Sequence, residues 1–262
     1  MQKTFILVLR LFLISSLFFT SCKVQDYSSN ARPISHNTWD SLLQKYVSVE
    51  GNVNYKGFIA DSIKFHKYLA LLSANHPNEK FWTQEERLAY WINAYNAFTV
   101  KLIIDHYPVV SIKDIKTGIP FINSVWDIKF IHIEEATYDL NNIEHGIIRQ
   151  KFNEPRIHFA INCASKSCPK LANYAFTADQ LDEQLDEAAK SFINGSDKNQ
   201  ISENEAKLSK IFLWYGGDFK KNSSQVEFIN KYSDVKISVH ADIDYLDYDW
   251  RLNEESQQIR RQ

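Results

Sequence analysis

The stretch "TQEERLAYWINAYNAFTVKLIIDHYP", residues 83–108, decides the fold of this chain. Thr83 followed by Glu86 is a capping-box pattern that predicts the start of a helix, and Pro108 marks its end. Large apolar side chains recur along one face at helical spacing: Leu88, Trp91, Ile92, Tyr95, Phe98 and Leu102. Alanine, valine and isoleucine leave the other sides apolar too. We therefore expect a helix that is buried on all sides at the centre of the molecule.

Two amides, Asn93 and Asn96, interrupt this apolar helix and share one face of it. A buried amide without a partner costs about 1–3 kcal/mol, so each side chain must meet a partner. They could tie the helix to neighbouring loops, contact a ligand or orient a catalytic histidine. The sequence leaves these roles open.

Further helices and short strands are expected on both sides of the central helix. Helical periodicity and capping residues favour helices at 37–48, 59–76, 141–150, 177–195 and 224–233. Strand-like patterns favour a hairpin at 125–140 and extended segments at 53–58, 156–163, 200–219 and 236–253. The mixture predicts an α+β fold, with helices around the central one and a modest, mainly antiparallel sheet. We expect one globular domain over residues 37–262.

The first residues, "MQKTFILVLRLFLISSLFFTSC", have the features of a bacterial export signal. Lys3 and Arg10 are basic, none is acidic, and the apolar run is too short and interrupted for a membrane span. Small residues before Cys22 resemble the cleavage box of bacterial lipoproteins, although Phe19 stands where leucine is usual. We expect a signal peptide at 1–21 and a lipidated Cys22. A plain secreted protein is the alternative.

A polar segment follows the expected cleavage point. Residues 22–36 lack periodicity, as a tether between a lipid anchor and a domain would. This predicts a membrane-anchored lipoprotein of the cell envelope, periplasmic or in the outer membrane, with the membrane as a partner. Without Lys3 and Arg10, 28 basic side chains stand against 32 acidic ones, a net charge of −4. Since no basic stripe stands out, we expect no nucleic-acid partner.

Five segments of the chain form an ordered set of motifs. They are "YWINAYNAF" (90–98), "SIKDI" (111–115), "LNNIEHGIIR" (140–149), "PRIHFAINCASKSCP" (155–169) and "YLDYDWRLN" (245–253). In this order and at these intervals they resemble the DUF547 family of uncharacterised proteins, over residues 80–255. The resemblance implies that any chemistry lies among polar residues of these motifs. Those residues are Asn93, Asn96, Glu144, His145, Arg149, His158 and Cys163.

Cys163 is the first candidate for chemistry. On an extended strand over 156–163, His158 would point to the opposite face and lie about 16 Å away, too far to act as its general base. His145, in the short helix before that strand, is the expected base, with Asn93, Asn96 or Glu144 orienting its ring or donating to an oxyanion. Such a partner matters because a thiol of ordinary pKa is only about 3 per cent ionised at pH 7. This arrangement would support hydrolase or acyl-transferase chemistry without a cofactor.

Cys163 and Cys168 are the only cysteines left if Cys22 is lipidated. An oxidising envelope favours joining them, and "ASKS" (164–167) is a turn-prone loop that could bring them within disulfide range. So small a loop would gain only about 2 kcal/mol. Two unremarkable thiols and a nucleophilic Cys163 are the alternatives, and a permanent disulfide excludes the nucleophile. No paired CxxC and no HExxH pattern is present, so we expect no metal site.

The other polar residues of the motifs also have two interpretations. Glu144 and His145 could form an ion pair or helix cap instead of a catalytic pair. Arg149 could bind an anionic group or pair on the surface, and His158 could be a ligand contact or a satisfied core histidine. The alternative to an enzyme is a non-catalytic module that binds a peptide, glycan or protein partner near Asn93 and His145.

Overall fold

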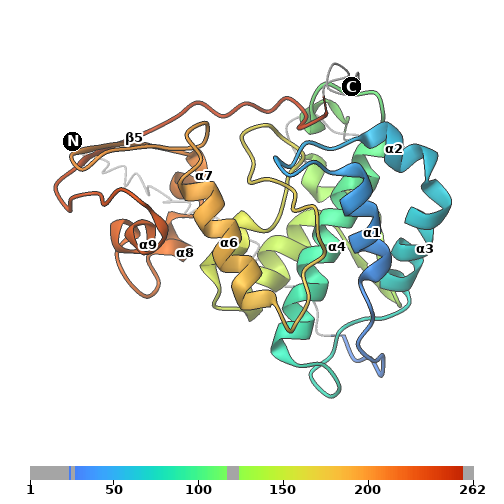
Figure 1. The fold of residues 1–262 in the computed structure, drawn as a ribbon. Coiled ribbons are helices and arrows are strands. Elements are labelled where there is room, and N and C mark those ends of the chain that lie inside the picture. Colours follow the sequence, from blue (N-terminus) through green and yellow to red (C-terminus); the bar gives the residue numbers. More distant parts are fainter. Residues whose placement is uncertain (1–23, 25–26, 117–123, 256–262) are drawn as a thin grey trace, which may run out of the picture.

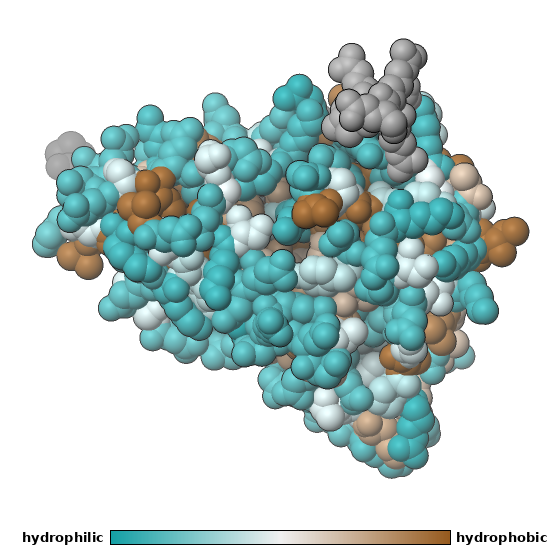
Figure 2. All heavy atoms as spheres, viewed as in Figure 1, coloured by the Kyte–Doolittle hydropathy of each residue, from teal (hydrophilic) through white to brown (hydrophobic). Residues whose placement is uncertain are grey.

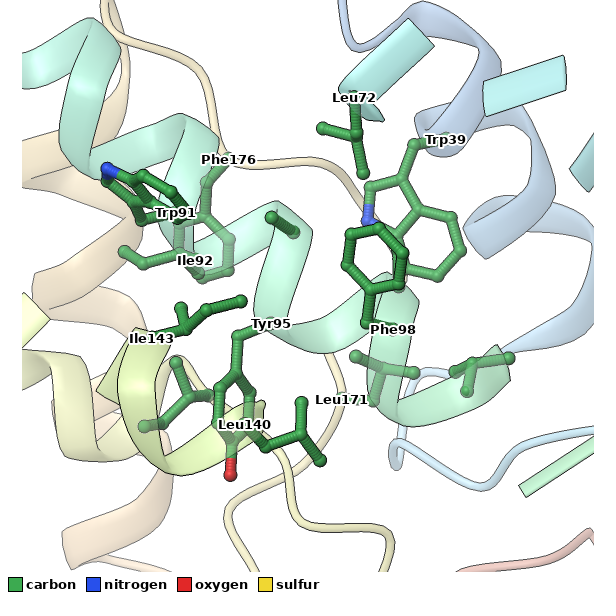
Figure 3. Packing of buried hydrophobic residues seen from close by; sticks show 14 of the residues in the cluster. Trp39, Leu72, Trp91, Ile92, Tyr95, Phe98, Leu140, Ile143, Leu171 and Phe176 are labelled. Atoms are coloured by element: carbon green, nitrogen blue, oxygen red, sulfur yellow. The ribbon is translucent and has the colours of Figure 1, made fainter. Parts of the chain in front are cut away.

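The helix α4 (Gln84–Asp105) lies at the centre of the computed structural model, which describes residues 24, 27–116 and 124–255 (Figure 1). Its capping box is complete, and every residue from 88 to 100 is buried. The predicted central helix is therefore confirmed. Apolar side chains from other segments surround it, with Trp39, Leu72, Leu140 and Phe176 among those drawn in Figure 3.

The expected signal peptide and the lipidation site Cys22 lie outside the described residues. Within those residues, no helix combines the length and apolar character that crossing a membrane requires. The described part of the expected tether, residues 27–36, lies against the domain. There the carbonyl oxygen of Ala31 accepts hydrogen bonds from the side chains of Asn78 and Trp82, at 2.8 and 2.9 Å.

Three helices precede α4 and pack in the same core: α1 (Asn37–Tyr46), α2 (Tyr55–Ala60) and α3 (Ser62–Ser73). The ring of Trp39 stacks on that of Tyr68, with centroids 5.6 Å apart. The extended segment expected at 53–58 is wrong, because most of it forms α2. The side chain of Asn54 accepts from the backbone N–H of Gly57 at 2.8 Å and thereby caps this helix.

The predicted hairpin is confirmed as β1 (Ile131–Ile133) and β2 (Ala136–Tyr138), which pair antiparallel. Two short 3-10 helices, η1 (Ile112–Asp114) and η2 (Val125–Asp127), come before it, each begun by a serine in a capping box. The helix expected at 141–150 is present as η3 (Asn142–Ile148), which is π-helical, and α5 (Arg149–Lys151).

The strand expected at 156–163 is wrong. Its first part is the 3-10 helix η4 (Pro155–Phe159), begun by Pro155 and by a hydrogen bond from the N–H of Arg156 to the Glu154 carboxylate. The apolar alternation has another cause, since this segment passes between two cores. Ile157 packs in the larger core around α4, whereas Phe159 packs in a smaller one.

The smaller core comprises Phe159, Ala189, Phe192, Ile193, Ala206, Leu208, Ile211, Phe212, Phe219, Ile229, Tyr232 and Ile237. Most of it belongs to α6 (Leu181–Ile193), β4 (Glu205–Leu208), α7 (Lys210–Trp214), α8 (Gly216–Phe219) and α9 (Gln225–Tyr232). The strand expected in the second half of 200–219 is wrong, because a hydrogen bond from the N–H of Ile211 to Ser209 starts α7 instead. Strand β4 pairs antiparallel with β3 (Gln200–Ile201) and parallel with β5 (Asp242–Tyr245).

After β5 the chain crosses from the smaller core to the larger one, along the upper edge of Figure 1. Single bridges then tie Leu252 to Ser165 and Arg251 to Ser111. The final described segment thus closes over the loop that follows η4. Helices dominate and the sheets are small, so the predicted α+β fold is confirmed. Most of the surface in the view of Figure 2 is hydrophilic.

Candidate functional site

Cys163 and Cys168 face each other across the loop that follows η4. Their sulfur atoms lie 2.9 Å apart, and the backbone N–H of Cys163 donates to the sulfur of Cys168 at 2.9 Å. Both are free thiols; Cys163 is half-buried and Cys168 is buried. The predicted disulfide stays a prediction, and the predicted proximity of the two side chains is present.

The turn that carries Cys163 is held in an unusual backbone conformation. Ala164 has a φ of 60°, in the left-handed region that alanine rarely adopts. The side chain of Asn162 accepts from the N–H of Ala164 at 2.8 Å and donates to the carbonyl of Pro169 at 2.7 Å. Strained residues of this kind cluster at functional sites, where surrounding contacts enforce them.

The hydrogen bond with Cys168 lowers the pKa of Cys163, and the hydroxyls of Ser165 and Tyr248 act in the same direction. These hydroxyl oxygens lie 3.4 and 3.3 Å from the Cys163 sulfur. Together they outweigh burial, which disfavours the thiolate. Burial raises the pKa of Cys168. Of the two thiols, Cys163 is therefore the one that ionises first.

A buried carboxylate, Glu144, contacts the central helix. It accepts a hydrogen bond from the hydroxyl of Tyr95 on α4, at 3.2 Å. Burial and then the charge of Glu144 raise the pKa of Tyr95 and of Tyr215. The same charge also raises the pKa of Cys163, against the stronger effect of its hydrogen bonds, so these four side chains form one electrostatic unit.

A second charged group adjoins this unit and brings the two predicted histidines together. The Asp218 carboxylate accepts from Arg149 Nε at 2.6 Å and lies 2.8 Å from His158 Nε2. Burial would raise the pKa of Asp218, but these partners hold it below its ordinary value. Arg149 also donates to His145 Nδ1 at 2.9 Å, and this ring nitrogen lies 3.9 Å from Glu144. Burial lowers the pKa of His158, whose ring stacks on Tyr215.

Among the described residues, only a few buried side-chain atoms have no hydrogen-bond partner. Two of them, Glu144 Oε1 and His158 Nδ1, lie in this cluster. The two residues are 5% and 2% exposed, so water does not freely satisfy these atoms. Because an unpaired buried polar atom costs about 1–3 kcal/mol, this pair is not explained by stability.

Asn93 and Asn96 also belong to the sequence motifs, but their contacts differ from those of the cluster around Glu144. Asn93 donates to the carbonyl of Phe176 and accepts from its N–H; Asn96 does the same for Ala160 and Asn162. These are the structural ties that the sequence allowed, and the ligand-binding role expected of the two amides stays a prediction. Asn96 nevertheless matters to the site, since it holds the residue before Cys163.

The contacts also correct the expected pairing of Cys163 with His145. Across the described part of the chain, the hydrogen-bond partners of the Cys163 sulfur are Cys168, Ser165 and Tyr248, and neither His145 nor His158 is one of them. His158 was expected on the opposite face of a strand from Cys163, but residues 155–159 form the 3-10 helix η4 instead. His158 instead belongs with Asp218.

Half-exposed aromatic rings border the thiol. Tyr248 packs against Trp214 and Trp250, with ring centroids 4.8 and 4.5 Å apart, and Trp126 lies 5.6 Å from Trp250. Trp214 is 45% exposed. Ser165 and Cys168 also help to line a cavity of about 450 Å³ beside α6. The aromatic rings and this cavity are two candidate ligand surfaces at the thiol pair.

Residues 80–193 match the family described as "Protein of unknown function, DUF547". This segment is a DUF547 domain. The match confirms the predicted resemblance over the first four motifs; the fifth, at 245–253, lies outside the matched residues. No curated protein and no solved structure matches the chain.

The DUF547 domain contains every catalytic and ligand-binding residue predicted from the sequence, but partners beyond residue 193 were missed. Tyr248 lay within a quoted motif, "YLDYDWRLN", so its place there was a signal. Tyr215 and Asp218 had none, because their contacts with the DUF547 domain depend on how α8 packs. Tyr95 was expected in the apolar core, and its spacing on the helix gave no sign that its hydroxyl would donate to Glu144.

Proposed function

We propose that this protein is a thiol-dependent hydrolase or acyl transferase in which Cys163 is the nucleophile. The observation that carries the proposal is the setting of Cys163: a half-buried thiol on a strained turn, hydrogen-bonded to Cys168, Ser165 and Tyr248. These contacts lower its pKa and so raise the thiolate fraction.

In the proposed reaction the Cys163 sulfur attacks a carbonyl carbon and forms a thioester. The bond between that carbon and the leaving group breaks, and the leaving group departs with the proton released by the thiol. Water, or an acceptor with an amine or hydroxyl, then attacks the thioester and restores the thiol. Water makes the enzyme a hydrolase, and another acceptor makes it a transferase.

Two neighbours have defined parts in this proposal. Burial raises the pKa of Tyr248, so its hydroxyl keeps its proton and can donate to the oxyanion beside the sulfur. We propose Glu144 as the group that carries the proton from the thiol to the leaving group, because its charge raises the pKa of Cys163, which favours a proton between the two groups, and its Oε1 has no hydrogen-bond partner. His145 and Arg149 are positioning residues that fix the surroundings of Glu144.

A chromogenic ester tests the proposal directly. The full-length protein is incubated under reducing conditions with p-nitrophenyl acetate, and peptide mass spectrometry locates the acyl group. We expect acetyl on Cys163, removable by hydroxylamine, and turnover that falls about a thousandfold in Cys163→Ser. Cys22→Ser is the matched control and should behave as the wild type. Equal turnover in Cys163→Ser and wild type would overturn the proposal.

A binding module is the second candidate, favoured by the half-exposed rings of Trp126, Trp214, Tyr248 and Trp250. Such a surface suits the apolar side chains of a peptide or the ring face of a glycan. If this is the function, ligand binding persists in Cys163→Ser and is lost in Trp214→Ala. If the protein is the proposed enzyme, turnover is instead lost in Cys163→Ser and falls less in Trp214→Ala.

We also infer that the protein is a lipoprotein of the cell envelope, exported by residues 1–21 and anchored through Cys22. The basic and apolar pattern of these residues and the small residues before Cys22 support the inference. Mass spectrometry of the protein extracted from bacterial membranes tests it. We expect a diacylated or triacylated Cys22 at the mature N-terminus, and a chain that keeps residues 1–21 in Cys22→Ala.

A further inference from the structure

The two thiols of the site have unequal surroundings, and this inequality suggests a second reaction. Cys163 is half-buried and has two hydroxyl neighbours besides Cys168, whereas Cys168 is 4% exposed. Cys163 is thus the less buried residue of the pair, and the sulfur of Cys168, which also helps to line the cavity beside α6, lies 2.9 Å from its own.

We propose that Cys163 and Cys168 form a thiol–disulfide exchange site that accepts low-molecular-weight disulfides, with Cys163 attacking and Cys168 resolving. The sulfur atoms need to approach by only about 1 Å to reach the S–S bond length. The intervening turn is already fixed by Asn162, which binds the N–H of Ala164 and the carbonyl of Pro169.

The exchange proceeds in two balanced steps. The Cys163 thiolate attacks one sulfur of the external disulfide, whose S–S bond breaks, and the released thiolate takes up a proton. Cys168 then attacks the Cys163 sulfur of the mixed disulfide, forms the Cys163–Cys168 bond and releases the second external thiol with the Cys168 proton. Two protein thiols are oxidised and one external disulfide is reduced to two thiols.

This pair accounts for both interpretations of the two cysteines in the sequence. The oxidised form has the disulfide that an oxidising compartment favours, and the reduced form has the nucleophile. If Cys163 is the nucleophile of the proposed function, the disulfide would also stop acyl transfer; that consequence rests on the proposed function. The exchange step itself does not depend on it.

Trypsin makes the test simple, because Lys166 lies between the two cysteines. The full-length protein is treated with oxidised glutathione and digested without reductant. In the wild type we expect peptides 157–166 and 167–170 joined by a disulfide. In Cys168→Ser, glutathione should remain on Cys163. In Cys163→Ser, glutathione should add to Cys168 at least about tenfold more slowly than it adds to Cys163 in Cys168→Ser.

Two results would overturn the inference. One is a lasting glutathione adduct on wild-type Cys163 without the joined peptides, because Cys168 then does not resolve it. The other is modification of Cys168 in Cys163→Ser at the rate seen for Cys163. Acyl turnover is measured in parallel on the reduced protein. Joined peptides from a protein without acyl turnover would leave this inference standing and refute the proposed function.

Discussion

Two sets of buried polar side chains, one on the central helix and one in the candidate site, differ in how completely they are hydrogen-bonded. Asn93 and Asn96 each meet a backbone carbonyl and a backbone N–H. Glu144 and His158 each leave one buried atom without a partner. Since unpaired buried atoms oppose folding, the first set serves stability and the second is retained for another reason. We therefore place the function at the second set.

The largest expected effect comes from the amide set. Asn96→Ala leaves the carbonyl of Ala160 and the N–H of Asn162 unpaired and should lower the free energy of unfolding by about 3 kcal/mol. Asn93→Ala, which has two equivalent partners on Phe176, is the matched control and should lose a similar amount. Denaturant unfolding measures both.

The two amide variants should differ in thiol reactivity. Asn96 holds the residue before Cys163, so Asn96→Ala should also alter the rate at which iodoacetamide modifies Cys163 under native conditions. Asn93→Ala should leave that rate unchanged. Equal effects of both variants on the rate would mean that Asn96 has no specific influence on Cys163 beyond its contribution to stability.

The second prediction concerns the incompletely paired set. Glu144→Gln keeps an acceptor for Tyr95 but removes the charge, so ester turnover should fall about a hundredfold while stability changes by less than about 1 kcal/mol. Tyr95→Phe is the control: it removes the hydrogen bond and keeps the carboxylate. Unchanged turnover in Glu144→Gln would show that another group carries the proton.

The same contrast explains how much could be predicted from the sequence. The helix α4 was predictable because apolar spacing, capping box and terminal proline all agreed along one continuous segment. The amide ties were allowed by the rule that buried amides need partners. The segment 156–163 was not predictable, because its alternation reflects two cores on its two sides rather than a pleated strand.

The candidate site was predictable only where it is local. Cys163 and Cys168 are five positions apart, and their proximity followed from the short loop between them. The Asp218 partner of His158 is 60 positions away, and Tyr248 is 85 positions from Cys163. Such contacts depend on how the smaller core docks on the larger one, which no periodicity encodes.

The third prediction uses pH to distinguish the amides from Asp218, the charged partner of His158. Because the pKa of Asp218 is held below its ordinary value of about 3.9, its ion pairs contribute fully above that pH and are lost as the pH falls towards the folded pKa. Between about pH 5 and pH 3, wild-type stability should therefore fall by about 1 kcal/mol more than that of Asp218→Asn. Urea unfolding at both pH values measures this. The loss caused by Asn93→Ala should be the same at each, since an amide does not titrate.

The smallest expected effect tests the strained turn itself. Ala164→Gly removes a buried methyl, worth about 0.8 kcal/mol, but relieves the left-handed backbone at φ 60°. The two terms nearly cancel, so the free energy of unfolding should change by less than about 1 kcal/mol. Ala94→Gly is the matched control, a buried alanine with helical backbone in α4, and should lose about 2 kcal/mol. A loss in Ala164→Gly as large as in Ala94→Gly would mean that the turn stores no strain, and Cys163 would then owe its reactivity to its hydrogen-bond partners alone.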